Sequence, residues 1–512
     1  MAWAPAIDLG EWLPDQPALK APALRKAQQV FPRGRGYDVW PIGEFANRGV
    51  LDARPRGAFS GRTRQGTNFV VAGTTSKLYL STTVGLVDET WLTGPYAADK
   101  RWDFTLFGDD LVAVDYIDAP QRFVLGTSTE FAQLHADAPR ARHCAVVREF
   151  LVMGNIVGRG VHAGIYGTRE DGVHWSAQGD AGGWPQAGTN AANAVLSDWQ
   201  ALIDDGGAIT DLVGGSDYGL VFKERSIWRM DFEGGSTFFG FHPIEQARGA
   251  IVPGSAIRVG ARTYFISGDG IYMTEGGGAS PIGSERVDRW LHDLHDHDRY
   301  EYTSTFVHPH LPVIGWAFRS KSFGGEAADR ILLYNYAVDR FSYASFVNEC
   351  MLTATQQAIS LDTAPYATTN MDGGTLTNLD EIVGGSETQL AYFNAADHGL
   401  YTLTGSGRTQ WAVLVTGDFE LAPGRTAIVN GVRMRYDAET TPSDPDLNYT
   451  AIIERRRRLN QELEMVTFAA PNEAGVARGR ASGRYHALHL ELGGPYKEVH
   501  GVEADFVARG VR

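Results

Sequence analysis

The densest group of side chains that could bind a metal lies in the stretch HDLHDHD, which begins at His292. His292, His295 and Asp296 have the i, i+3, i+4 spacing that places side chains on one face of a helix. His308 and His310 follow shortly after. Zinc takes three or four such ligands that converge on it. The same residues fall on the polar face of an amphipathic helix, where charged side chains meet water. The second interpretation is favoured, and no metal ligand is nominated.

The most basic run of the chain consists of four consecutive arginines: Arg455, Arg456, Arg457 and Arg458. Clustered guanidinium groups can clamp phosphate groups. The run is short, however, and Glu454 and Glu462 flank it. A solvated strand or a subunit interface is therefore favoured over a phosphate clamp, and the role of the run stays open.

A second candidate, TREDGVHW at residues 168–175, resembles the Asp-box of sialidases and related propellers, S/T-x-D-x-G-x-x-W. Thr168, Gly172 and Trp175 match this pattern, but Glu170 stands at the Asp position. In those proteins the box shapes a turn far from the chemistry, so it bears on fold rather than on activity. The chain also lacks G-K-[ST], His-Glu-x-x-His and G-x-S-x-G. No spacing nominates a carboxylate pair for glycoside hydrolysis, so no catalytic or cofactor-binding residue is nominated, and no cofactor is expected.

Composition limits the fold and the partners. The chain has 512 residues, 43% of them apolar, and its 60 glycines exceed the ~7% average and favour an all-β fold with many turns. No apolar run reaches the ~18 residues of a membrane-spanning helix, and Asp8 interrupts the N-terminus too early for a secretory signal. The net charge of −15 argues against gripping a nucleic-acid backbone. Cys144 and Cys350 are expected to be buried free thiols, as in a protein assembled in a reducing cytoplasm.

Repeated hairpins are the main structural signal. The stretch from Gly214 to Gly235 has an apolar strand, a polar turn at 223–226 and a second alternating strand, Trp228–Phe232, whose aromatic face must be buried. Similar turns occur near positions 75, 118, 158, 224, 269, 338 and 398. Propeller blades repeat every ~40–50 residues, and the wider gaps would hold insertions. The pattern predicts a β-propeller, with unrelated hairpins in a large β-sandwich as the alternative; it does not give the number of blades.

Three regions follow from this pattern. Residues 1–60 are expected to form an extended N-terminal arm that contributes to the platform, with a short helix near Ala23–Val30. Residues 61–405 hold the propeller, interrupted by an amphipathic helix at Ser284–Asp298 with Ser284 as its N-cap. Residues 406–512 contain alternating strands that predict a C-terminal β-sandwich, with Val432, Met434 and Tyr436 on one face of the first and Leu488, Leu490 and Leu492 on one face of another.

Several of these segments together resemble a virion protein of short-tailed bacteriophages (podoviruses), the tail hub or nozzle. The resemblance is carried by RWDFTLFGDDLVAVDYIDAPQRFVLG, DLVGGSDYGLVFKERSIWRMDF and YFISGDGIYMTEGGGASPIGSERVDRW, with TGDFELAPGRTAIVNGVRMRYD near the C-terminus. It implies a propeller joined to a β-sandwich platform and a structural protein without catalytic residues. Six copies would form a ring below the portal and adaptor that continues the DNA-ejection channel and carries tail fibres or spikes.

The same resemblance implies a location in the virion tail after assembly in the host cytoplasm. Viral DNA would pass through the ring without sequence-specific binding, and an acidic channel wall would keep it from sticking. The alternatives are a carbohydrate- or receptor-binding propeller and, less favoured, a sialidase- or glycosidase-like enzyme. Ring stoichiometry, host, gating residues and the choice between a nozzle and another tail ring do not follow from the sequence.

Overall fold

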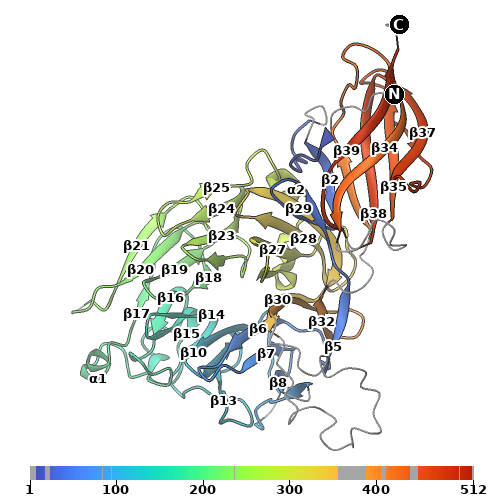
Figure 1. Cartoon of the computed structure of the whole chain (residues 1–512). Coiled ribbons are helices and arrows are strands. Elements are labelled where there is room, and N and C mark those ends of the chain that lie inside the picture. The colour runs from blue at the N-terminus through green and yellow to red at the C-terminus, as the bar shows by residue number, and fades with distance from the viewer. Residues whose placement is uncertain are drawn as a thin grey trace, which may run out of the picture.

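The structure is a computed structural model of the chain (Figure 1). It describes residues 7–17, 23–82, 85–93, 95–235, 237–355, 388–404, 411–438, 448–494 and 496–509. Almost all secondary structure in these ranges is β-strand. The helices there are short, and none is long and apolar enough to cross a membrane.

Seven antiparallel four-stranded units, here called blades, make up the larger part of the molecule. Blade 1 is β6 (Gly57–Arg62), β7 (Asn68–Gly73), β8 (Leu78–Thr82) and β9 (Gly85–Asp88). Blade 2 is β10 (Asp103–Phe107), β11 (Asp110–Val114), β12 (Gln121–Val124) and β13 (Ala132–Gln133). Blade 3 is β14 (Arg140–Val147), β15 (Phe150–Val157), β16 (Thr168–Trp175) and β17 (Asp198–Ala201). Blade 4 is β18 (Ile209–Val213), β19 (Tyr218–Lys223), β20 (Ile227–Phe232) and β21 (Phe239–Glu245).

The remaining blades use more distant parts of the chain. Blade 5 is β22 (Ile257–Val259), β23 (Arg262–Ser267), β24 (Gly270–Thr274) and β25 (Ser280–Pro281). Blade 6 is β26 (Ser304–Val307), β27 (Val313–Phe318), β28 (Ala328–Asn335) and β29 (Arg340–Asn348). Blade 7 is β30 (Cys350–Thr355), β31 (Thr388–Phe393), β32 (Gly399–Leu403) and β5 (Gly43–Val50), so an N-terminal strand completes it.

The first strands of the blades form a closed ring. β6 contacts β10, β10 contacts β14, β14 contacts β18, β22 contacts β26, β26 contacts β30, and β30 returns to β6. Blades 4 and 5 are joined by the backbone N–H of Ala256, which donates to Asp211 Oδ2 at 3.0 Å. Figure 1 shows the blades arranged around a common centre. The architecture is a seven-bladed β-propeller. Six of the seven turns expected from the sequence lie between the second and third strands of a blade, whereas the turn near 338 lies between the third and fourth strands of blade 6.

The hairpin of blade 4 shows how this architecture uses alternation. Leu220 and Phe222 belong to the core shared with blade 5, whereas Val221 and Met230 belong to the core shared with blade 3. Both faces of a blade are therefore buried against neighbours, which compensates for the marginal stability of an isolated hairpin. Met230 is fully buried, but Trp228 is only half-buried. The expectation of full burial was wrong for Trp228, because its indole lies at the rim and donates to Asp204 Oδ2 at 2.9 Å.

The turn of this hairpin is also more buried than its polar residues suggest. Lys223 is 1% exposed; its Nζ donates to the carbonyl of Leu202 at 2.8 Å and forms an ion pair with Asp204. Asp204 additionally accepts from Ser226 Oγ at 2.6 Å. Burial opposes ionisation of this carboxyl, but its hydrogen bonds with Lys223, Ser226 and the Trp228 indole prevail and hold its pKa at about 2. The charged turn therefore fastens the connection from blade 3 to blade 4.

Two further sheets face each other beside the propeller and share one hydrophobic core. The first sheet contains β1 (Ile7–Asp8), β3 (Val30–Pro32), β4 (Tyr37–Val39), β34 (Ala427–Ala438), β37 (Val476–Gly483) and β39 (Tyr496–Ala508). The second contains β2 (Leu24–Gln28), β33 (Ala412–Thr416), β35 (Asn448–Arg456), β36 (Glu464–Thr467) and β38 (Tyr485–Gly493). The alternating faces expected at the C-terminus are confirmed: Leu488, Leu490 and Leu492 are buried, as are Val432 and Met434.

The second of these sheets continues directly into the propeller. β2 pairs in parallel with β29 of blade 6 through Gln28 and Tyr343, and antiparallel with β33. The result is one nine-stranded sheet that runs from the first strand of blade 6 to β36. In Figure 1 the blue β2 lies between β29 and the orange strands. The first 60 residues thus supply strands to both parts of the molecule.

The helix expected near Ala23–Val30 is wrong: Leu24–Gln28 is the strand β2. Its residues, LRKAQ, are good helix formers. Here, however, the backbone groups pair with strands on both sides, and Leu24 and Ala27 enter the core. Tertiary pairing has overridden local propensity.

The helix expected at Ser284–Asp298 is shorter than predicted. α2 spans Asp288–Leu294, and its residue Leu291 is buried as expected. Ser284 is not its N-cap; instead the carboxylate of Asp15 accepts from the backbone N–H groups of Arg289 at 2.8 Å and Trp290 at 2.9 Å. The cap therefore comes from the N-terminal segment, 274 residues away in sequence. The other short helical segments are α1 (Asn190–Ala194) and 3-10 turns at Gly160–His162 and His297–Tyr302.

Candidate functional site

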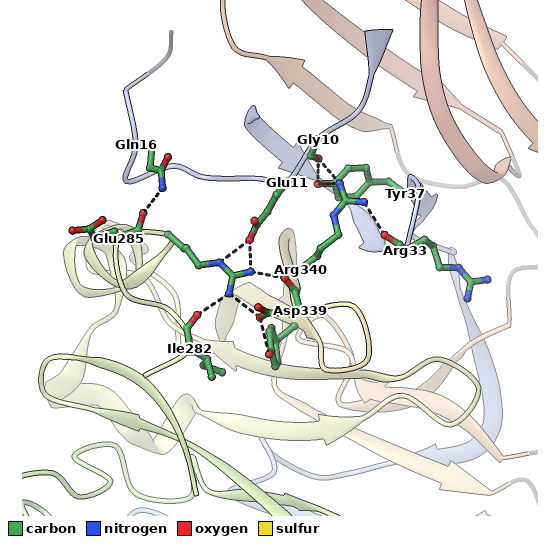
Figure 2. Close-up of polar contacts among 11 residues, drawn as sticks. Gly10, Glu11, Gln16, Arg33, Tyr37, Ile282, Glu285, Asp339 and Arg340 are labelled. Atoms are coloured by element: carbon green, nitrogen blue, oxygen red, sulfur yellow. Dashed lines mark hydrogen bonds and ion pairs between the residues drawn. The ribbon is translucent and has the colours of Figure 1, made fainter. Parts of the chain in front are cut away.

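The junction between the N-terminal segment and the propeller is the first candidate site. Arg340, at the start of β29, donates to the carbonyls of Leu9 at 2.9 Å and Arg33 at 2.8 Å and to that of Gly10. The hydroxyl of Tyr37 donates to the same Gly10 carbonyl at 2.8 Å. Figure 2 shows Arg340 of the propeller meeting Gly10, Arg33 and Tyr37 of the N-terminal segment. Arg340 thereby satisfies backbone acceptors of a segment that has no sheet partner at that point.

A second arginine links the same two parts. Nε of Arg286 donates to Glu11 Oε1 at 2.7 Å, and its Nη1 donates to Asp339 Oδ1 at 2.7 Å and to the Ile282 carbonyl at 2.9 Å. Nearby, Gln16 Nε2 donates to the Glu285 carbonyl at 3.1 Å (Figure 2). Partly buried arginine–carboxylate contacts fix geometry as well as contribute energy. The junction is therefore a specific interlock and not a loose linker.

A groove of about 1880 Å³ lies beside this interlock. Its walls come from the N-terminal segment, the β28–β29 turn and the end of the two facing sheets, and they include Glu11, Arg340, Tyr436 and Tyr496. Guanidinium and carboxylate groups occur in similar number along it. The groove thus has no single charge that would select an anion or a cation.

The axis of the propeller holds a second cavity, of about 470 Å³. Its walls come from the first strands of all seven blades. Arg101, just before β10, crosses one end of the axis and donates to the carbonyls of Pro253 at 3.2 Å and Thr303 at 3.3 Å. Gly254 has φ +72°, and a Cβ there would collide with the Arg101 guanidinium. One end of the axis is therefore closed by an arginine side chain.

Polar side chains also form hydrogen bonds between neighbouring blades around the axis. Asp103 Oδ2 in blade 2 accepts from the backbone N–H of Cys144 in blade 3 at 3.1 Å. Ser304 Oγ in blade 6 accepts from that of Met351 in blade 7 at 2.9 Å. Asp211 makes the equivalent bond from blade 4 to blade 5, and its burial raises the pKa of its carboxyl to about 6. These polar groups around the axis thus link neighbouring blades by hydrogen bonds.

The four consecutive arginines lie at the end of β35 and in the turn after it. Arg455 forms an ion pair with Glu464 at 2.7 Å and donates to the Ser482 carbonyl at 3.0 Å, and Arg456 pairs with Asp418. The side chains of Arg457 and Arg458 are exposed. Half of the run is therefore occupied by internal contacts, which favours a strand role over a phosphate clamp.

The histidine stretch does not lie wholly on a polar helix face. His295 is fully buried, against Phe318 and His297, and its Nδ1 is 2.9 Å from Nδ1 of His297. The expected polar-face position was wrong for His295, because α2 ends at Leu294 and the chain turns inward. Burial lowers the pKa of His295 to about 3. Among the described residues, no three His, Cys, Asp or Glu side chains form a group that could hold a metal ion.

The remaining candidates are structural. Thr168–Trp175 forms strand β16, whose pairing with β15 shifts register between Ile156↔Arg169 and Gly154↔Val173. At this bulge Gly172 packs closely against Arg169 and against Ile156 of the neighbouring strand. The resemblance to an Asp-box stays a prediction. Cys144 and Cys350 are free and buried, as expected, and burial raises both thiol pKa values.

Sequence reasoning missed the residues that join distant segments. Arg101, Arg286 and Arg340 each contact partners more than 50 residues away, and Asp15 caps a helix 274 residues away. A single sequence carries no signal for such pairs.

Comparisons with known proteins give only distant structural likenesses. No protein-family model matches this chain, and no curated protein matches it. The β-propeller domain of Cps50 (Swd1) from Myceliophteria thermophila aligns with a TM-score of 0.39 at 7% identity, covering 69% of this chain and 98% of that one. The computationally designed Ika8 protein aligns with a TM-score of 0.37 at 8% identity, covering 77% of this chain and 99% of that one. The propeller assignment therefore rests on the strand topology described above.

Proposed function

We propose that this chain is a structural virion protein of a short-tailed bacteriophage, the tail hub or nozzle. Copies of it form a ring that continues the DNA-ejection channel below the portal and adaptor. The resemblance to the tail hub or nozzle implies six copies in this ring. The ring carries tail fibres or spikes, assembles in the host cytoplasm and has no enzymatic activity of its own.

The nine-stranded sheet is the observation that carries this proposal. A component that transmits load between neighbours must keep its parts in fixed relation. Here the propeller and the paired sheets share hydrogen-bonded strands through β2, and Arg286 and Arg340 lock the same junction. A closed propeller also leaves only short strand edges exposed. This construction suits a rigid ring subunit better than a pair of hinged domains.

The axial cavity of the propeller is too narrow to be such a channel. Its 470 Å³ equals a cube about 8 Å on a side, whereas the major groove of DNA alone is about 12 Å wide. Arg101 also crosses its end. The DNA path is therefore enclosed between copies, and the propeller axis is not that path.

The net charge of −15 supports passage without binding, because an acidic wall repels the phosphate backbone. We expect Asp and Glu side chains to dominate the surface that the assembled ring turns toward DNA. A strongly positive lumen in the assembled ring would contradict this part of the proposal.

The test is the native mass of the purified full-length protein, alone and mixed with candidate portal and adaptor proteins. The proposal expects a closed oligomer, six copies, or its formation on addition of the adaptor. A chain that stays monomeric with and without these partners would overturn it and favour a binding propeller.

A further inference from the structure

We propose that a hollow on the propeller, where the first strands of blades 6, 7 and 1 end, binds a neutral saccharide. This proposal does not depend on the ring, because it concerns one chain and one face of its propeller. It adjoins the axial cavity, and both are lined by Ala58, Phe59, Ile257, Thr305 and Met351. Within the described part of the chain it shares no lining residue with the groove beside the junction, and its walls carry none of the charged side chains of the axial cavity.

The hollow has a volume of about 750 Å³, within the range of ~300–1,000 Å³ typical of small-ligand sites. It lies further along β6, β26 and β30 than the axial cavity does: Ser60, Val307 and Thr353 line it, whereas Gly57, Ser304 and Cys350 line the cavity. The loop after β26, His308–Pro312, forms one wall, and Tyr336 stands at another. It is thus a shallow site built from several blades.

The lining of the hollow carries no Asp, Glu, Lys or Arg among the described residues, in a chain that has 107 of them (46 basic and 61 acidic). Burial and the nearby His310 and Arg33 lower the pKa of His308, the most buried of its imidazoles, to about 4, so His308 is neutral at pH 7. A charged ligand would lose hydration here without gaining a counter-charge. The lining therefore selects a neutral ligand.

The same lining offers polar groups with unused hydrogen-bonding capacity. The hydroxyls of Ser60, Thr305 and Tyr336 have no hydrogen-bond partner within the part of the chain that the structure describes. Nδ1 of His308 accepts from the backbone N–H groups of His310 and Leu311, both at 3.1 Å, which leaves its Nε2 protonated as a donor. These groups suit a ligand rich in hydroxyls.

Aromatic and proline surfaces complete the site. Phe59 and Tyr336 are half-buried, so each presents part of a ring, and Pro309 and Pro312 border them. Partly exposed rings supply apolar contact area at low entropic cost, and a tyrosine adds a polar tip. A saccharide has an apolar C–H face and polar edges, and this combination matches it better than an apolar peptide, which would leave the hydroxyls unused.

Binding of neutral oligosaccharides to the full-length protein tests the proposal. Maltotriose, cellotriose and tri-N-acetylchitotriose serve as probes, and 3′-sialyllactose is the charged control. Isothermal titration or ligand-observed NMR should detect saturable binding of at least one neutral probe, with a Kd at or below the order of 1 mM. The charged control should bind more weakly or not at all.

Variants then place the binding in the hollow. Tyr336→Ala should weaken the neutral probe roughly tenfold through the lost aromatic contact. His310→Ala, at the exposed rim, should weaken it less. His242→Ala is the matched control, since His242 is exposed on β21 of blade 4 and outside the hollow, and it should bind as the wild type does. Melting curves check that each variant is folded.

Three results would overturn the proposal. They are no saturable binding of any neutral probe, binding that Tyr336→Ala and His310→Ala leave unchanged, and equal binding of the charged control. Cross-links from this hollow to a second copy of the chain would likewise replace the saccharide by a protein partner. The three binding results do not bear on the native mass, so the ring proposal is tested separately from them.

Discussion

The propeller and the paired sheets beside it are both antiparallel β-structures, but they are assembled differently. Each of blades 1–6 comes from one continuous stretch, and only blade 7 borrows a strand, β5, from the N-terminus. In the paired sheets, strands from residues 7–39 lie between or beside strands from residues 412–508. The propeller is therefore a series of local hairpins, whereas the paired sheets combine strands from both ends of the chain.

This difference should separate their responses to mutation. Loops between adjacent strands cost little entropy to close, and that cost grows with the length of chain enclosed. Damage within one blade should therefore stay near that blade. Damage to the N-terminal segment should instead release contacts in both regions at once.

Trp12→Ala should have the largest effect, about 3–5 kcal/mol of stability. Trp12 is 1% exposed; its ring centroid lies 4.9 Å from those of Trp290 and Tyr343, and its Nε1 donates to the Arg25 carbonyl at 3.2 Å. Hydrogen exchange should quicken in α2, β29 and β33 together, with blades 2 and 3 unchanged. Trp411→Ala is the control, because Trp411 is 54% exposed and should change stability by about 0.5 kcal/mol or less. Faster exchange confined to the first 40 residues would contradict the shared-strand account.

Met230→Ala tests the local character of the propeller and should cost about 2–5 kcal/mol. Met230 is fully buried in the core between blades 3 and 4. Trp228→Ala, on the same strand, should cost about 2 kcal/mol, since Trp228 is half-buried and loses one hydrogen bond to Asp204. Chemical denaturation measures both. A larger loss for Trp228 than for Met230 would place the blade interface elsewhere.

The pH dependence of the paired sheets should show the burial of His486, in β38. Burial lowers the pKa of His486 to about 4, below its ordinary value of about 6.5, so the unfolded chain binds the proton first. Its contribution to stability is present above pH 6.5 and is lost as pH falls toward 4. Between pH 8 and pH 5 the loss is about 2 kcal/mol. His486→Gln should lack this pH-dependent loss, so the stability difference between wild type and variant should be about 2 kcal/mol smaller at pH 5 than at pH 8. A stability difference that does not change with pH would contradict the burial of His486.

The smallest effect is expected from the distant helix cap. Asp15→Ala should cost about 1 kcal/mol, because the N–H groups of Arg289 and Trp290 lose their acceptor. Ser284→Ala, at the residue that local pattern suggested as the cap, should be nearly neutral. Thermal unfolding of the two variants measures the difference in stability loss. A larger loss for Ser284→Ala than for Asp15→Ala would show that Ser284 caps the helix and would contradict the distant cap.

The same contrast explains how far the fold could be predicted from the sequence. The blade turns were predictable because each hairpin carries its own signal, such as the Asp-Gly turn at 269–270. β2 was mistaken for a helix because only partners about 315 and 390 residues away make LRKAQ a strand. Arg101, Arg286 and Asp15 escaped for the same reason. The uncharged hollow was equally invisible, because its lining comes from residues 58 to 388.

Electron cryomicroscopy of the purified assembly tests the central claim most directly, that rigid copies of this chain enclose a channel between them. The account predicts a closed ring whose lumen is bordered by several copies, with each propeller and its paired sheets in one fixed orientation and Arg101 closing each propeller axis. Isolated chains, or copies in which the paired sheets swing relative to the propeller, would contradict it.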